Sequence, residues 1–118
     1  MARYRLTKSA TRDIGSILRT SEVRHGRDAR TRYAALLLAA MRCVAEYPEG
    51  RSTSDRSELR PGLRSFHIRH SRDESREAPV ANPVHVIFYR VIQRDVVEIV
   101  RVLHDRMEPR RHIGASPE

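Results

Sequence analysis

The chain has 118 residues, of which 39% are hydrophobic and 5% aromatic, and its formal net charge is +8. This length fits one domain with a modest core, which must be built mainly from Leu, Ile, Val and Ala because Trp is absent. No apolar run approaches the roughly 18–20 residues of a membrane-spanning helix, and the N-terminal residues lack the apolar stretch of a signal peptide, so we expect a soluble cytoplasmic protein.

The first two predicted elements are a short strand and a helix. Residues 3–7 alternate polar and apolar side chains, which predicts a strand with Tyr4 and Leu6 turned inward. Ser9 is the expected N-cap of a helix over residues 9–24. The apolar positions at helical spacing are Ala10, Ile14, Ile17 and Leu18.

A second, longer helix follows directly. Gly26 ends the first helix, and an apolar stripe then predicts a helix over residues 27–47 that stops at Pro48. The stripe consists of Ala29, Tyr33, Leu36, Leu37, Ala40, Val44 and Tyr47. The short link makes the two helices an antiparallel hairpin. Cys43, the only cysteine, lies in this helix and is expected to be a small packed side chain in a reducing compartment.

The middle of the chain is predicted to contain one strand between two loops. Residues 48–58 are rich in Ser, Arg, Gly and Glu, which is typical of a loop. Residues 63–70 alternate, which predicts a strand with Phe66 and Ile68 buried. The composition then shifts to polar residues and proline, so we expect an exposed insertion over residues 71–83.

The last third of the chain predicts a β-hairpin. Residues 84–92 and 96–104 are rich in β-branched side chains, and the three residues between them indicate a tight turn. Both strands are apolar on both faces, as central strands are, with the helical hairpin covering one face. The predicted fold is therefore an α+β domain over residues 1–113, with an N-terminal strand, an antiparallel helical hairpin and a mostly antiparallel sheet of three further strands, followed by a flexible tail over residues 114–118.

The basic charge is carried almost entirely by arginine. Lys8 is the only lysine among the 23 Lys and Arg residues. Guanidinium groups form rigid paired hydrogen bonds with carboxylates and phosphates, so this surface suits an acidic protein segment or a nucleic acid. A GC-rich genome also favours arginine over lysine, so charge alone identifies no partner.

Several short motifs occur in an order that is similar to one known family. They are Ala10-x-x-Asp13-Ile14, Tyr33, Pro48-x-Gly50, Leu59-Arg60-Pro61-Gly62-Leu63-Arg64, Phe88-Tyr89-Arg90, and Val102-Leu103-His104-x-Arg106-Met107 followed by Arg111-His112. Each motif alone is weakly specific. Their order and spacing across nearly the whole chain resemble the ParE branch of the RelE/ParE toxins, the toxin halves of bacterial toxin–antitoxin pairs. The insertion over residues 71–83 departs from that family, whose connection there is tighter.

The resemblance implies a toxin of a type II toxin–antitoxin system that inhibits DNA gyrase, blocks replication and performs no covalent chemistry. It also implies a cognate antitoxin with a DNA-binding N-terminal part and a C-terminal segment that wraps the toxin. The expected target contacts are Arg106, Arg110, Arg111 and His112. The expected antitoxin contacts are Arg64, Phe66, Tyr89 and Arg101. Specific DNA binding by the toxin alone is not expected, because no recognition-helix motif occurs.

An alternative is the RelE branch, which shares this fold and cuts messenger RNA on the ribosome. Such cleavage needs a base for the 2′-hydroxyl, an acid for the leaving oxygen and cations on the scissile phosphate. The candidate residues are Arg64, Tyr89, Arg90 and His104. The lysine-rich catalytic strand of RelE-like ribonucleases has no counterpart here, so gyrase inhibition is the first hypothesis and ribosome-dependent endoribonuclease activity the second.

The six histidines do not predict a metal site. His67 and His70 are three residues apart on an expected strand and therefore point to opposite faces, and no cysteine or helical histidine pair accompanies them. We therefore expect neither a metal nor another cofactor.

Overall fold

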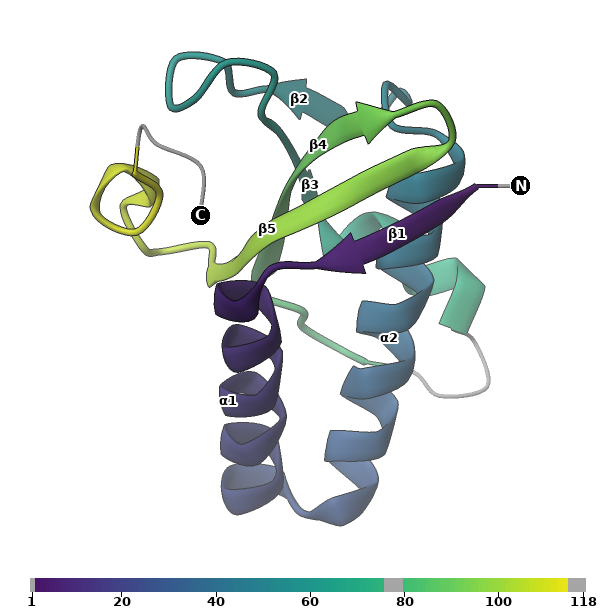
Figure 1. The fold of residues 1–118 in the computed structure, drawn as a ribbon. Coiled ribbons are helices and arrows are strands. Elements are labelled where there is room, and N and C mark those ends of the chain that lie inside the picture. The colour runs from purple at the N-terminus through teal and green to yellow at the C-terminus, as the bar shows by residue number, and fades with distance from the viewer. Residues whose placement is uncertain (1, 76–79, 115–118) are drawn as a thin grey trace.

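The computed structural model describes residues 2–75 and 80–114, which form a five-stranded sheet with two long helices packed on one of its faces (Figure 1). The elements in chain order are β1 (Arg3–Leu6), α1 (Lys8–His25), α2 (Arg27–Glu46), β2 (Thr53–Asp55), β3 (Arg64–His67), the 3₁₀ helix η1 (Ile68–Ser75), β4 (His85–Gln93), β5 (Val96–His104) and the 3₁₀ helix η2 (Pro109–Arg111). None of the described helices is long and apolar enough to cross a membrane.

The strand order across the sheet is β1-β5-β4-β3-β2. β1 pairs with β5 in parallel, and the other three pairings are antiparallel. The predicted α+β fold and its mostly antiparallel sheet are therefore confirmed, as is the central position of β4 and β5. β2 was not predicted, because its three residues lie in a polar stretch that has no apolar alternation.

The C-terminal end of β1 differs from the sequence prediction. Thr7, not Ser9, is the N-cap of α1, because its hydroxyl oxygen accepts a hydrogen bond from the Ala10 N–H at 3.0 Å while its hydroxyl donates to the Val100 carbonyl at 2.7 Å. Leu6 is 38% exposed and so is not turned fully inward, whereas Tyr4 packs against the core as expected.

The helical hairpin forms as predicted. Gly26 links the helices with a φ of 93°, a conformation that glycine adopts without steric cost. The apolar stripe of α2 packs against the sheet from Tyr33 to Val44, with Cys43 half-buried beside it. Tyr47, which was predicted to belong to the stripe, follows the end of α2 and is 64% exposed. The fully buried members of the stripe are Leu36, Leu37, Ala40 and Val44.

A register shift in the β4–β5 hairpin changes which residues face the helices. Phe88 pairs with Arg101 and Tyr89 with Ile99, so Val100 has no Cα partner in the ladder. Ile99 contacts the helix-side core, and strict alternation would bring Arg101 to the same face. Because of the irregularity, Val102 contacts that core instead. The shift therefore keeps the Arg101 side chain out of the helix-side apolar core, and its guanidinium contacts Asp13 of α1 instead.

The sheet buries a separate apolar cluster on each face. The helix-side cluster contains the α2 stripe and side chains from four strands, among them Phe66, Ile87 and Tyr89. The opposite cluster consists of Leu59, Leu63, Phe88, Val100, Leu103 and Ile113, with Val86 beside it. The second face is thus closed by the loop before β3 and by one residue of the C-terminal segment.

The segment after β3 corrects two expectations. The predicted strand over residues 63–70 ends at His67, and η1 then packs against α2, although Phe66 and Ile68 are buried as expected. Ser71 is fully buried, so the first part of the predicted insertion over residues 71–83 is not exposed. Residues 76–79 of that insertion, and the predicted tail beyond residue 114, lie outside the described residues.

Candidate functional site

The C-terminal segment, residues 105–114, follows β5 and turns back beside the sheet (Figure 1). Glu108 is the N-cap of η2, because its carboxylate accepts from the Arg110 N–H at 3.1 Å. The N–H of Ile113 donates to the Pro109 carbonyl at 2.9 Å, which closes the turn. The segment is therefore a hydrogen-bonded turn rather than an extended tail.

Ile113 anchors this segment by its side chain. It is 5% exposed and packs into the apolar cluster on the second face of the sheet. Beside it, Arg60 is 6% exposed and its Nε donates to the Gly114 carbonyl at 3.2 Å. An apolar contact and an arginine-to-carbonyl bond thus fix the end of the described chain.

Arg101 supplies the second polar anchor. Its Nε and Nη2 donate to the two oxygens of Asp13 on α1 at 2.7 and 2.9 Å, and its Nη1 donates to the His112 carbonyl at 2.7 Å. Asp13 also accepts from the Val102 N–H at 3.0 Å. Arg101 therefore ties α1, β5 and the C-terminal segment together, so its guanidinium already has a structural role where an antitoxin contact was expected.

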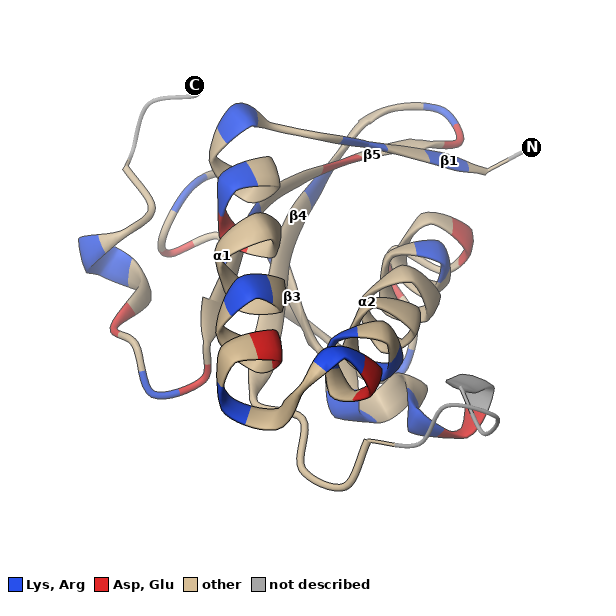
Figure 2. Ribbon diagram, turned by 90° about the horizontal axis from the view of Figure 1, so that it is seen from below, with Lys and Arg blue, Asp and Glu red and all other residues tan. Residues whose placement is uncertain are grey.

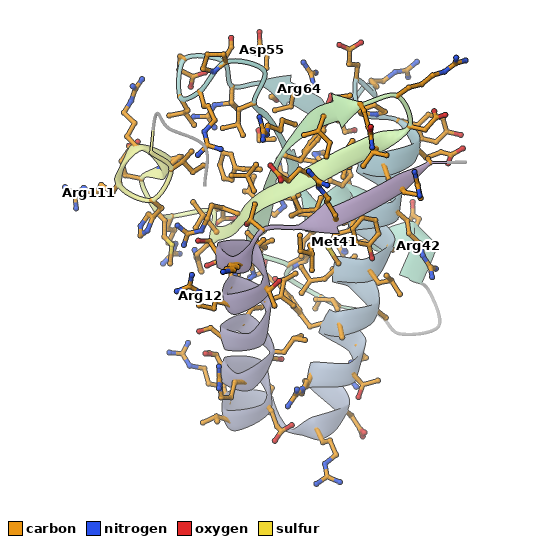
Figure 3. All side chains as sticks on the ribbon, in the orientation of Figure 1. Arg12, Met41, Arg42, Asp55, Arg64 and Arg111 are labelled. Carbon is orange, nitrogen blue, oxygen red and sulfur yellow. The ribbon has the colours of Figure 1, made fainter. Side chains whose placement is uncertain are left out.

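The basic residues of the segment point to solvent. Arg106, Arg110, Arg111 and His112 are all exposed. The structure gives none of these three arginines a salt bridge with a described carboxylate. Figure 2 shows Lys and Arg positions on both α1 and the C-terminal segment, and Figure 3 shows Arg12 of α1 and Arg111 projecting on the same side of the molecule. We call the surface formed by Arg106, Arg110 and Arg111 the C-terminal basic surface.

Three of the expected antitoxin contacts are buried or engaged on the helix side. Phe66 is 3% exposed, in line with its predicted burial, and Tyr89 is fully buried, so neither side chain lies open at the surface. The Tyr89 hydroxyl donates to the Pro48 carbonyl, and burial raises the pKa of this hydroxyl. Arg64 donates from Nε to the same carbonyl at 3.1 Å and from Nη2 to the Thr53 hydroxyl at 2.8 Å. These side chains hold the loop after α2.

The structure does not bring the expected ribonuclease residues together. Arg64 and Tyr89 face the helix side, whereas Arg90 lies beside Glu98 and donates to its Oε1 from Nε at 3.0 Å. His104 is at the opposite end of the hairpin from Arg90. Strand alternation places Tyr89 and Arg90 on opposite faces, and the hairpin puts His104 at its far end, whereas only the sheet order decides that Arg64 lies opposite Tyr89.

A polar cluster that the sequence did not indicate lies where β4 begins and β5 ends. The Tyr33 hydroxyl accepts from the Val84 N–H at 3.1 Å and lies 2.6 Å from His85 Nδ1. The His85 ring meets that of His104 edge to face, with centroids 5.5 Å apart. Burial, and then the proximity of His104, lower the pKa of His85 to about 4. His85 is therefore neutral at physiological pH, and its Nδ1 shares a hydrogen bond with the Tyr33 hydroxyl.

Asp105 extends this cluster to β3. Its Oδ2 lies 2.9 Å from His67 Nε2 and its Oδ1 3.3 Å from His104 Nδ1. The hydrogen bond from His67 holds the pKa of Asp105 below its ordinary value. The second nitrogen of His67 accepts from the Arg69 N–H at 3.1 Å, so both of its ring nitrogens are occupied. The cluster thus joins α2, β3, β4 and β5 by hydrogen bonds and ring contacts.

Metal binding has little support in this geometry. Within residues 2–75 and 80–114 there is no group of three or more His, Cys, Asp or Glu side chains that could hold a metal ion. The histidines at the ends of β4 and β5 contact tyrosine, aspartate and each other.

The fold and the C-terminal basic surface define a small, basic α+β protein. Residues 4–109 match the family described as the ParE toxin of the type II toxin–antitoxin system parDE. The chain is 38% identical over 114 residues to Toxin ParE1 of Caulobacter vibrioides (strain ATCC 19089 / CIP 103742 / CB 15), which covers 97% of this chain and all of the relative. The chain therefore belongs to the ParE toxin family and is the toxin of a type II toxin–antitoxin system.

A solved structure agrees with this fold. It is described as the chromosomal ParDE TA system from P. aeruginosa, and it superposes with a TM-score of 0.63 over 88% of this chain and 96% of that chain. The sequence identity of 15% supports the shared fold alone.

Proposed function

We propose that this toxin inhibits DNA gyrase by binding, blocks replication without covalent chemistry of its own, and is neutralised by direct contact with a cognate antitoxin. One observation carries the proposal: the C-terminal segment is anchored at Ile113, Arg101 and Arg60, while the arginines of the C-terminal basic surface remain exposed. Membership of the ParE toxin family supports the same target.

The anchoring gives the basic surface a physical advantage in binding. A disordered arginine-rich tail loses conformational freedom when it binds, at about 0.5–1.5 kcal/mol for each immobilised side chain and more for the backbone. Here the backbone turn at η2 is already hydrogen-bonded, so part of that cost is met on folding. Exposed guanidinium groups then attract acidic or phosphate-bearing partners and speed their encounter.

The positive net charge of the toxin also supports its neutralisation by an antitoxin. A net charge of +8 favours an acidic segment that folds on binding and covers apolar and basic surface together. The DNA-binding part of the antitoxin would supply operator recognition, since the toxin sequence has no recognition-helix motif.

The proposal is tested by a supercoiling and cleavage assay with purified gyrase and relaxed plasmid. The variant replaces Arg106, Arg110 and Arg111 with Gln. We expect the wild-type protein to block supercoiling and trap cleaved DNA, and the variant to lose at least about tenfold in potency because guanidinium contacts are removed. The matched control replaces Arg19, Arg24 and Arg27, three exposed arginines of the helical hairpin, with Gln. This control has the same net charge as the first triple variant. It should nevertheless inhibit gyrase nearly as well as the wild-type protein does.

Two results would contradict the proposal. Equal loss in both triple variants would show that net charge, rather than the C-terminal basic surface, determines inhibition. Cleavage of ribosome-loaded messenger RNA by the wild-type protein, with gyrase unaffected, would replace gyrase inhibition by endoribonuclease activity.

A further inference from the structure

β1 forms one edge of the sheet, and in the described part of the chain no strand pairs with its outer side (Figure 1). The N–H groups of Arg3 and Thr7 donate toward β5 over 2.7 and 3.1 Å. Successive residues of a strand direct their backbone groups to opposite sides. Tyr4 and Leu6 therefore direct their N–H and C=O groups to the outer edge, where another chain can pair with them.

The opposite edge of the sheet offers less for pairing. β2 has only three residues, and its last residue, Asp55, accepts from the Ser57 N–H at 2.9 Å. Short edge strands with charged side chains are a common protection against pairing with other chains. β1 is one residue longer but also carries charged side chains, so what favours it as the template is the pair of hollows beside it.

Two adjoining hollows lie beside β1. The first, of about 480 Å³, is lined by residues of β1 and of the end of α2, including Tyr4, Arg42 and Ala45. The second, of about 310 Å³, shares Ala45 with the first and continues to Val97 of β5. A side chain of an added strand can enter these hollows from the helix side of β1.

The charges along this edge select one kind of partner. Arg3 and Arg5 alternate with Tyr4 and Leu6 and so lie on the sheet face away from the helices. Arg5 is paired only loosely, at 3.8 Å from Glu98, and its side chain is 64% exposed. Arg42 adds a third exposed guanidinium at the rim of the larger hollow (Figure 3). Glu46 and Asp95, which also line the hollows, offset part of this charge.

We propose that β1 accepts an extended acidic segment of the antitoxin as a sixth strand of the sheet. Main-chain hydrogen bonds to Tyr4 and Leu6 supply the pairing. The segment alternates acidic residues, which face Arg3 and Arg5, with apolar residues, which cover Leu6 and enter the hollows beside Tyr4. This inference rests on the proposed neutralisation by an antitoxin, and it adds the place of binding and the residue pattern of the partner.

The test uses the full chain and a capped peptide that alternates glutamate and valine over eight residues, at millimolar concentration. Amide hydrogen exchange is followed by NMR. We expect the N–H groups of Tyr4 and Leu6 to exchange at least about tenfold more slowly with the peptide, because they become hydrogen-bonded in a ladder. A control peptide that alternates lysine and valine should give no protection, because it is repelled by Arg3 and Arg5.

Two variants separate main-chain pairing from side-chain contact. Leu6→Pro removes one outward N–H but none of the N–H groups directed toward β5, and it should abolish the protection at Tyr4. Leu6→Ala keeps the N–H group and should retain the protection. Arg3→Glu with Arg5→Glu should reverse the preference between the two peptides, which keeps the test valid even if Leu6→Pro fails to fold.

The outcomes distinguish this inference from the proposed target. A protein that inhibits gyrase but shows no protection of Tyr4 and Leu6 with the glutamate peptide refutes the strand site alone. Protection by both peptides, or protection at β2 in place of β1, also overturns it. A protein that shows the expected protection but leaves gyrase untouched retains the strand site and loses the target.

Discussion

The two faces of the sheet are closed by different means. On the helix side, α1 and α2 cover the strands, and the central side chains, such as Leu36 and Ile87, are fully buried. On the other side, a loop and the single side chain of Ile113 complete a smaller cluster. A face covered by long helices unfolds with the whole domain, whereas a face closed by a chain end can open locally. The second face is thus where stability and function can be changed separately.

The polar residues of the two faces differ in the same way. On the helix side, Arg64 and Tyr89 bind the Pro48 carbonyl and hold a loop that covers the core. On the other side, Arg101 and Arg60 bind carbonyls of the C-terminal segment itself. The first pair supports the fold, while the second pair supports the candidate target surface.

Truncation of Leu36 should have the largest effect. Leu36→Ala removes a fully buried side chain from the helix-side core, so we expect a loss of about 4 kcal/mol in the free energy of unfolding, measured by urea denaturation. Leu38→Ala on the same helix is the control, because Leu38 is 37% exposed and should cost under about 1 kcal/mol. Similar losses at both positions would mean that the α2 stripe is not the centre of the core.

Removal of the Asp13 carboxylate should be next. Asp13→Ala leaves the half-buried Arg101 guanidinium without its carboxylate and the Val102 N–H without an acceptor, at a cost of about 3 kcal/mol. Thermal denaturation measures this loss. Asp28→Ala, an exposed carboxylate in the first turn of α2, should cost less than about 1 kcal/mol. A small effect at Asp13 would show that Arg101 does not depend on this pair.

Ile113→Ala should uncouple stability from function. We expect a loss of about 2 kcal/mol, the low end for such truncations because the chain end can relax, together with faster amide exchange at Ile113. If gyrase is the target, inhibition should fall by more than the small unfolded fraction explains. Met107→Ala in the same segment is the control, since Met107 is 45% exposed. Full inhibition by a protein whose C-terminal segment is mobile would contradict the role of anchoring.

A change of pH from about 7 to about 6 should give the smallest effect, because only the start of the His85 titration falls in that range. In the unfolded protein His85 takes up a proton near its ordinary pKa of 6.5, whereas burial lowers the pKa to about 4 in the folded protein. Between these two pH values the unfolded state therefore binds more protons than the folded state. Stability should therefore fall as pH decreases through this window. We expect the melting temperature of His85→Gln, which cannot titrate there, to fall less than that of the wild-type protein. Parallel curves for the two proteins would assign the pH dependence to other groups, such as His70, whose pKa burial also lowers.

The sequence by itself determined the elements that depend on neighbouring residues. The helical hairpin is encoded in the apolar stripe of α2 and in Gly26, and the β4–β5 hairpin in two runs of β-branched side chains around a tight turn. These patterns act over a few residues, so they can be read along the chain. The motifs that resemble the ParE branch were sufficient for the family.

Only the tertiary structure decided which face each polar residue occupies. The register shift at Val100 turns Arg101 toward Asp13, which is 88 residues away in the chain, and toward the C-terminal segment. Tyr89 reaches the Pro48 carbonyl across 41 residues. A strand pattern assigns faces by strict alternation, and one unpaired residue reverses that assignment for all that follow. Ile113, a single apolar residue in a basic tail, was the one local signal that this segment packs on the sheet.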